Sequence, residues 1–198
     1  MNQPIDIFYS LPEIWDFCLD KIYQKGEYIK GLEKFFKSED ISKKSLIMDA
    51  GCGSGFPALD LISREYKVVA TDKSSEMIRQ IKLNAKKRNL KINAKHIAWS
   101  ELSEKFKGVF DLVYCRGNSL VYAASWKQNW IVPKRSKEEI LEAVSNFYKI
   151  LRPNGKLYID ITKRNETPHK KIIGTIKTKY GRIKIIWQIR HDLKNRIR

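Results

Sequence analysis

Residues 45–55 read Ser-Leu-Ile-Met-Asp-Ala-Gly-Cys-Gly-Ser-Gly, and this stretch decides the fold of the chain. The apolar run 45–50 predicts a buried strand, and the alternating glycines after it let the backbone turn sharply and approach a ligand closely. Leu59, Leu61 and Ile62 then follow the spacing of a helix. A strand, a glycine loop and a helix in this order predict a ligand-binding turn in a parallel α/β sheet.

The loop differs from two other glycine-rich loops. The dinucleotide fingerprint G-x-G-x-x-G needs a small residue directly after Gly55, where this chain has Phe56. A phosphate-binding loop needs Gly-Lys-Ser/Thr, which does not follow here. Phe56, together with an acid at Asp49, argues against a pyrophosphate and for adenosylmethionine. A tight strand-to-helix turn without a ligand is the alternative interpretation.

The pattern downstream alternates between strands and helices. Strands are predicted at 68–71, 91–97, 109–115 and 156–161, and helices at 74–89 and 136–151. Such alternation predicts right-handed βαβ units, and hence an α/β, Rossmann-like, doubly wound and mostly parallel sheet with helices on both faces. Residues 172–178 and 183–189 alternate in polarity around Gly181, which predicts an additional C-terminal antiparallel hairpin.

A second site residue follows the second predicted strand. Asp72 lies 21 positions after Gly51, where an acid can accept hydrogen bonds from both ribose hydroxyls. Taken alone, Asp72 before Lys73 is also consistent with a turn or a helix cap. The pairing of the glycine loop with this acid favours a bound nucleoside.

The order of motifs resembles class I S-adenosylmethionine-dependent methyltransferases. The resemblance rests on Leu46 to Gly55, Asp72, Ala98-Trp99, Phe110-Asp111 and the run Leu-Arg-Pro-Asn-Gly at 151–155. It implies S-adenosyl-L-methionine as cofactor and an adenine site at Ala98 and Trp99, although Trp99 equally suits a core position. The cofactor-binding residues expected from it are Asp49, Gly51, Gly53, Gly55, Asp72, Lys73, Ala98, Trp99 and Cys115.

A narrower resemblance concerns Cys115-Arg116-Gly117-Asn118-Ser119-Leu120, which is similar to the segment lining the methyl-transfer site of glycine and sarcosine N-methyltransferases. It implies that Asn118 and an arginine past the fifth strand contact the acceptor carboxylate. Arg164 is the candidate arginine, two residues farther from Asp160 than in that family. Arg116 is the alternative, because an arginine fork suits a carboxylate. The expected catalytic residues are thus Asn118, Arg164 and Arg116, acting on a small amine or amino acid.

Two regions flank the predicted core of residues 45–162 within one domain spanning 1–198. Residues 1–44 are expected to form a helical lid, with core packing as the equal alternative for most of its aromatic residues. Tyr9 and Tyr28 are the aromatic residues that we would test. Residues 163–198 form a basic extension. Class I sheets usually end with two further strands, so the hairpin either completes the sheet or covers it. We favour a cover, with the enzyme truncated at its C-terminal end and self-association at the exposed strand edge.

The charge of the chain keeps two other functions open. The formal net charge is +17, and eleven Lys and Arg residues face two acids between Arg164 and Arg198. Phosphate neutralisation by such residues favours nucleic acid. The alternatives are therefore an RNA or protein methyltransferase and a non-catalytic nucleic-acid-binding module. The small molecule is favoured, because the basic residues mix with acids up to about residue 163.

The remaining sequence features narrow the setting. No apolar run reaches the roughly 18 residues of a membrane helix, and residues 1–14 carry acids instead of a basic signal sequence. A cytoplasmic protein without a membrane partner is therefore predicted. The three cysteines and three histidines show no metal-ligand spacing, so no metal is expected.

Overall fold

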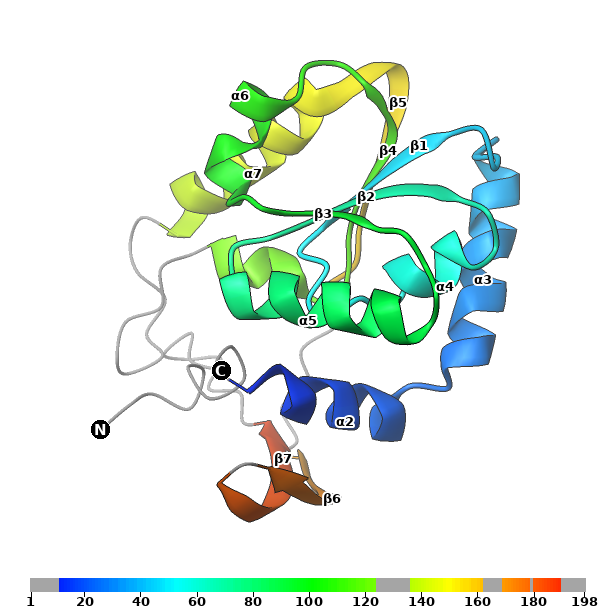
Figure 1. The fold of residues 1–198 in the computed structure, drawn as a ribbon. Coiled ribbons are helices and arrows are strands. Elements are labelled where there is room, and N and C mark those ends of the chain that lie inside the picture. The colour runs from blue at the N-terminus through cyan, green and yellow to red at the C-terminus, as the bar shows by residue number, and fades with distance from the viewer. Residues whose placement is uncertain (1–10, 124–135, 162–168, 179, 190–198) are drawn as a thin grey trace.

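A computed structural model describes residues 11–123, 136–161, 169–178 and 180–189. Its centre is a five-stranded parallel sheet with the order β3-β2-β1-β4-β5 (Figure 1). The strands are β1 (Leu46–Ala50), β2 (Lys67–Asp72), β3 (Asn93–His96), β4 (Phe110–Cys115) and β5 (Leu151–Ile159). The predicted α/β class and parallel sheet are confirmed.

The strand order places the glycine loop at the switch point of the sheet. β1 pairs with β2 on one side and with β4 on the other, so the connections leave β1 and β4 in opposite directions. In such sheets the crevice beyond the carboxyl ends at this point is where ligands bind. The loops after Ala50, Asp72 and Cys115 meet there.

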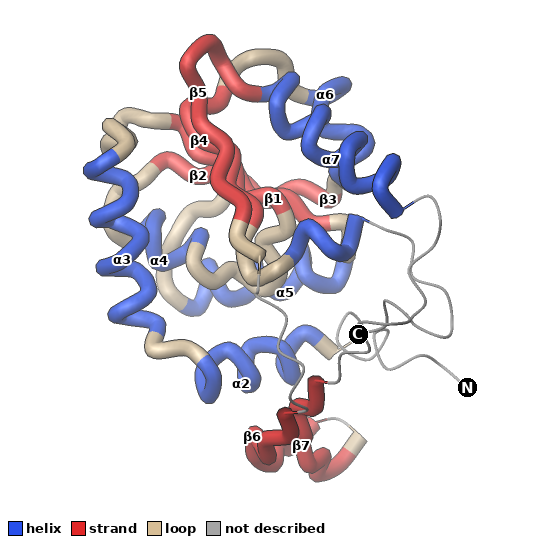
Figure 2. The backbone as a smooth tube through the Cα atoms, turned by 180° about the vertical axis from the view of Figure 1, so that it is seen from behind, coloured by secondary structure: helices blue, strands red, loops and turns tan. Residues whose placement is uncertain are grey.

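Helices cover both faces of the sheet (Figures 1 and 2). The elements α3 (Lys25–Ser38), α4 (Ala58–Ile62) and α5 (Ser75–Lys87) cover one face, and α6 (Leu102–Lys105) and α7 (Ser136–Ile150) cover the other. Ile47 packs in the first core and its neighbour Met48 in the second. Because successive strand residues point to opposite faces, the apolar residues of β1 contribute to both cores.

The N-terminal helical segment consists of two helices. The chain leaves α2 (Pro12–Ile22) at Tyr23, and Gln24 has the non-helical angles φ −79° and ψ 78° before α3 begins. The Tyr23 ring then meets the Tyr28 ring edge-on, with centroids 5.9 Å apart. The break lets α2 lie along α5 while α3 packs on the sheet (Figure 2).

The fifth strand begins earlier than predicted. β5 starts at Leu151 instead of 156, because Leu151 already pairs with Phe110 of β4, and the turn at Asn154 (φ +63°) lies between this pair and the next one, Leu112 with Lys156. The register shifts between Phe110 and Leu112, which accommodates the additional residues. Such an irregularity takes up extra residues in one strand without ending the pairing.

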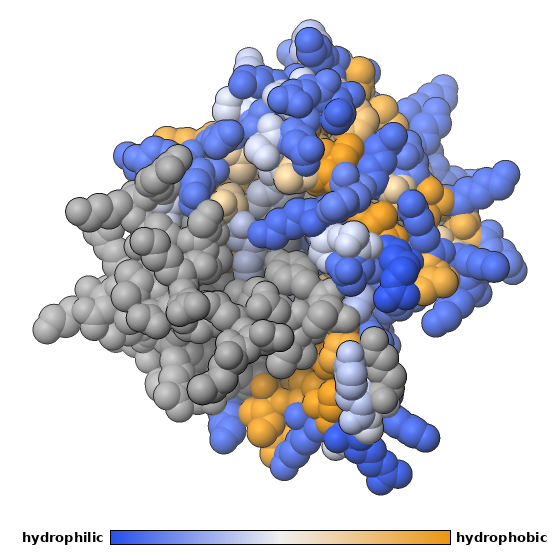
Figure 3. Space-filling view, turned by 60° about the vertical axis from the view of Figure 1, so that its left-hand side comes forward, coloured by the Kyte–Doolittle hydropathy of each residue, from blue (hydrophilic) through white to orange (hydrophobic). Residues whose placement is uncertain are grey.

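The predicted hairpin is formed by β6 (His169–Thr178) and β7 (Gly181–Ile189), which pair in antiparallel fashion. Its inner face packs on α2, where Ile173 and Ile185 are buried against Leu11, Ile14 and Cys18. The outer face exposes Ile172 and Ile186 among basic residues. Figure 3 shows hydrophobic and hydrophilic surface side by side at the lower end of the molecule, where the hairpin lies.

Candidate functional site

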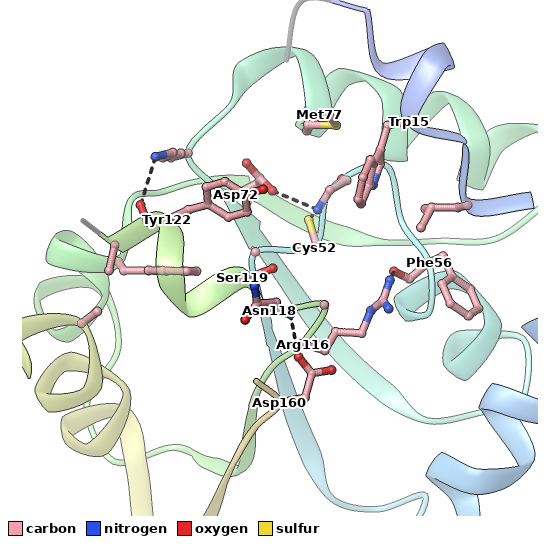
Figure 4. Close-up of a pocket in the computed structure, with 18 of the residues that line it drawn as sticks. Trp15, Cys52, Phe56, Asp72, Met77, Arg116, Asn118, Ser119, Tyr122 and Asp160 are labelled. Atoms are coloured by element: carbon pink, nitrogen blue, oxygen red, sulfur yellow. Dashed lines mark hydrogen bonds between the residues drawn. The ribbon is translucent and has the colours of Figure 1, made fainter. Parts of the chain in front are cut away.

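A cavity of about 880 Å³ opens beyond the carboxyl ends of β1, β2 and β4 (Figure 4). Its volume lies within the range of sites that bind small molecules and cofactors. Eight of the residues predicted for the site line it: Gly51, Gly53, Asp72, Lys73, Ala98, Trp99, Arg116 and Asn118. Loops far apart in the sequence are thus brought together by the sheet.

Two glycines of the loop face indole rings. A Cβ atom at Gly51, where φ is +92°, would lie 3.2 Å from Cζ2 of Trp99. A Cβ atom at Gly53, where φ is +52°, would lie 3.2 Å from Nε1 of Trp15 on α2. Any side chain would narrow the cavity between the loop and these rings, so glycine is required both by backbone angle and by space. Gly55 instead faces the core.

Asp72 organises the opposite wall of the site. One carboxylate oxygen accepts a hydrogen bond from the Gly53 amide and the other from the Ser74 amide, each at 2.9 Å. Burial raises the pKa of Asp72, and these hydrogen bonds counteract the rise. Each carboxylate oxygen has a second lone pair, so the group can still accept ribose hydroxyls. Lys73 follows and donates from Nζ to the Tyr122 carbonyl oxygen at 3.4 Å.

The loop after β3 supplies the aromatic end of the cavity. Ala98 and Trp99 both line it, and the Trp99 ring meets Phe147 of α7 edge-on with centroids 5.3 Å apart. Trp99 therefore has both of the positions considered for it from the sequence. Its ring packs against the core, and the residue also lines the cavity. A flat apolar wall of this kind suits a purine base.

Asp49 and Cys115 lie behind the cavity wall. Asp49 is 1% exposed, and its Oδ2 atom has no hydrogen-bond partner in the part of the chain that the structure describes. Burial raises the pKa of Asp49 to about 7, against the opposing charge of Arg116. Cys115 is fully buried, and burial raises the pKa of its thiol. Asp49 and Cys115 therefore support the wall of the cavity without lining it, whereas Cys52 does line it.

The segment after β4 carries the predicted acceptor residues. Asn118 adopts a left-handed φ of +59°, and its backbone N–H donates to Oδ1 of Asp160 at 2.7 Å. Arg116 is 7% exposed, and its guanidinium lies among the rings of Tyr23, Tyr28 and Phe56. Arg164 and Tyr9 lie outside the described residues. Tyr28 packs behind Arg116 and does not line the cavity.

Several lining residues are not among the predicted site residues, although Trp15 and Tyr23 belong to the predicted lid. Trp15 and Met77 reach the cavity from helices, Tyr23 from the turn after α2, Asp160 from directly after β5 and Lys171 from the hairpin. The position of Asp160, directly after the fifth strand, was a usable signal, because every strand end of this sheet edge contributes to the site. Among the described residues, no group of three His, Cys, Asp or Glu side chains is arranged to hold a metal ion.

A family model described as a methyltransferase domain matches residues 47–155, which is more than half of the chain. The chain belongs to this family. The match confirms the class I S-adenosylmethionine-dependent methyltransferase predicted from the order of the motifs, with S-adenosylmethionine as its cofactor. The cavity fits that group, because it combines an acid, a glycine loop and a buried cation within one enclosure.

Curated relatives of the methyltransferase share part of their length with it. A glycine/sarcosine N-methyltransferase of Aphanothece halophytica is 27% identical over 75% of this chain and 51% of its own length. One of Halorhodospira halochloris is 28% identical over 58% of this chain and 38% of its own. The chain thus spans about half or less of these relatives.

Solved structures confirm the fold. An S-adenosylmethionine-dependent methyltransferase from Clostridium acetobutylicum ATCC 824 superposes with a TM-score of 0.59 at 14% identity, covering 95% of this chain and 83% of the other. None of the described helices is long and apolar enough to span a membrane.

Proposed function

We propose that this methyltransferase transfers the methyl group of S-adenosylmethionine to the nitrogen of a small amine that carries a carboxylate, such as glycine or sarcosine. The observation that carries the proposal is the segment from Cys115 to Leu120, which resembles the acceptor segment of such enzymes and lines the cavity with Arg116 and Asn118. The names of the two curated relatives support the same acceptor class.

The donor half of the proposal assigns roles to the cavity walls. Asp72 accepts the ribose hydroxyls, Ala98 and Trp99 enclose the adenine, and Gly51 and Gly53 let the backbone approach the donor. Asp49, Gly55 and Cys115 support this loop from behind, and Lys73 borders it. S-adenosylmethionine supplies an electrophilic methyl group on a sulfonium sulfur. Alignment of the nucleophile in a closed, dry cavity is then the main contribution of the protein.

The acceptor half centres on Asn118. The backbone N–H of Asn118 donates a hydrogen bond to the Asp160 carboxylate. The left-handed turn that presents the Asn118 side chain is therefore anchored to the end of β5. An amine with a pKa of roughly 8 or above must lose a proton before it can accept a methyl group. Neutral polar groups such as Asn118 and Tyr122 suit that uncharged amine. Arg164 supplies a further grip on the acceptor carboxylate in this proposal.

A second candidate function is favoured by the hairpin. No acid occurs between His169 and Ile189, and the cross-strand partners Lys177 and Arg182 place like charges opposite each other. Like charges in that arrangement repel, and a polyanion relieves the repulsion. An RNA or protein substrate, or nucleic-acid binding without turnover, therefore competes with the small amine.

A labelled-methyl assay separates these functions. Glycine, sarcosine, dimethylglycine and total RNA serve as acceptors, and we expect incorporation into glycine or sarcosine. Incorporation into RNA alone would overturn the proposed acceptor. Asn118→Ala should lower turnover far more than donor affinity, and Asp72→Ala should do the reverse.

The matched control is Asn154→Ala. Asn154 also has a left-handed φ, +63°, but it is exposed in β5 and does not line the cavity. It therefore carries the same backbone penalty without the proposed contact. Equal losses of turnover in the two asparagine variants would contradict the role of Asn118.

A further inference from the structure

Arg116 is a buried cation held in place by aromatic rings. It directly follows β4 and is 7% exposed. Its guanidinium carbon lies 4.8 Å from the ring centroid of Phe56 and 5.2 Å from those of Tyr23 and Tyr28. Cations over ring faces at such distances are attracted by the ring quadrupole, more strongly where water is excluded. The side chain is thus fixed before any ligand binds.

The hydrogen bonds of Arg116 are incomplete. Nη2 donates to the Phe56 carbonyl oxygen at 3.1 Å, and the guanidinium lies within reach of the Tyr28 hydroxyl, but among the described residues Nη1 itself is buried without a hydrogen bond of good geometry. Across the described ranges, no carboxylate forms an ion pair with the guanidinium. A buried charged donor left unpaired is costly, so an unpaired Nη1 at a cavity wall indicates an anionic ligand.

The nearest buried acid only partly balances this cation. Asp49 is the buried acid whose charge acts on Arg116, but its raised pKa of about 7 leaves it partly protonated near neutral pH. Asp160 also borders the cavity, and its Oδ1 accepts a hydrogen bond from the backbone N–H of Asn118. Arg116 therefore shares the cavity wall with this acid without forming an ion pair to it among the described residues.

An anionic ligand group at Arg116 could be the carboxylate of the donor or that of the acceptor, and the position of Arg116 favours the donor. Figure 4 shows Asp72 and Arg116 on opposite sides of Cys52, so the glycine loop lies between them. All the ring contacts of Arg116 come from the lid and from Phe56, directly after that loop. A donor with its ribose at Asp72 would extend its amino-acid end along the loop towards Arg116.

We propose that Arg116 binds the carboxylate at the amino-acid end of the donor, with the lid tyrosines holding the guanidinium in place. The inference rests on the proposed function, and it gives Arg116 a different role from the acceptor contact expected from the sequence. It also couples the lid to the donor, because Tyr23 and Tyr28 touch the group that touches the ligand.

Calorimetric titration of the full chain with two ligands tests this role. S-adenosylhomocysteine has the amino-acid end, and 5′-methylthioadenosine lacks it. Arg116→Gln should weaken S-adenosylhomocysteine by roughly ten- to a hundred-fold, the range for a lost hydrogen bond to a charged group. Methylthioadenosine binding should change by less than about two-fold, and Arg116→Lys should restore part of the lost affinity.

The other outcomes have distinct meanings. Equal weakening of both ligands would overturn the proposal in favour of a structural role, and a raised acceptor KM with unchanged S-adenosylhomocysteine affinity would overturn it in favour of the acceptor. If Arg116→Gln does not fold, the wild-type chain is titrated with the decarboxylated analogue of S-adenosylhomocysteine, and binding as tight as that of the parent would overturn the proposal. A wild-type chain that binds neither adenosyl ligand would refute the proposed function itself.

Discussion

The carboxyl group of Asp49 illustrates how one residue couples stability to pH. Its pKa is raised from 3.8 to about 7 in the folded chain, mainly by burial. Because the folded-state value exceeds the unfolded one, the stabilisation is complete below about pH 4 and is lost as the pH rises to about 7. Asp49→Asn, which mimics the protonated acid, should match the wild type at pH 4 and exceed its free energy of unfolding at pH 8 by up to roughly 4 kcal/mol.

Urea denaturation at the two pH values checks this expectation. The difference between variant and wild type must grow between pH 4 and pH 8. A constant difference would show that Asp49 ionises as freely in the folded chain as in the unfolded one.

Gly55 tests the packing of the loop separately from its ligand contacts. Its φ is +118°, and a Cβ atom there would lie 2.8 Å from Cγ1 of Ile81 and 2.9 Å from Cδ1 of Leu59. Gly55→Ala should therefore lower the free energy of unfolding by roughly 2–4 kcal/mol, through backbone strain and overpacking. Gly26→Ala in α3 is the control, because a Cβ atom at Gly26 meets nothing within 4 Å. Thermal denaturation of both variants measures the difference, and equal stabilities would refute the packing role.

At the scale of elements, the hairpin should dock as a unit on α2. Ile185 is 8% exposed and faces α2, while its neighbour Ile186 is 46% exposed on the other face. Ile185→Ala should cost roughly 2–4 kcal/mol of docking energy and loosen the hairpin, and Ile186→Ala should cost much less. Hydrogen exchange should then accelerate in β6 and β7 but not in β1. Parallel acceleration throughout the sheet would contradict independent docking.

The elements predicted from the sequence are those with local signals. β1 and the glycine loop follow from an apolar run and three glycines, and the helix from Ser75 to Lys87 from its serine cap, whose hydroxyl accepts the Met77 amide. The break at Tyr23 and the early start of β5 have no such signal, because packing against distant residues sets them. The contact between Trp15 of the predicted lid and Gly53 also has no local signal, since only the fold brings the two residues together.

The candidate site divides in the same way. Eight of its predicted residues line the cavity because strand ends in a parallel sheet converge, which the motif order already implies. The surroundings of Arg116 could not be predicted, because the three rings around it come from the loop after β1, from α3 and from the turn between α2 and α3. The sequence thus identified the arginine but not its neighbours.

For the whole molecule, the charge of +17 leads to a prediction about salt. A zwitterionic amino-acid acceptor carries no net charge, so kcat/KM for glycine or sarcosine should change by less than about three-fold between 50 and 200 mM salt. An acceptor held through several phosphates would lose affinity by roughly 10³-fold or more over that range. Steady-state assays at both salt concentrations measure this change in kcat/KM. A steep loss of kcat/KM with the amino acid would indicate that the basic surface takes part in acceptor binding.

Calorimetric titration of the purified chain tests most directly whether the glycine loop and Asp72 together hold an adenosyl sulfur compound. We expect S-adenosylmethionine and S-adenosylhomocysteine each to bind at one site per chain, with Asp72→Ala weakening both and NAD giving no heat of binding. Uptake of NAD, with no response to either adenosyl ligand, would contradict this function of the cavity.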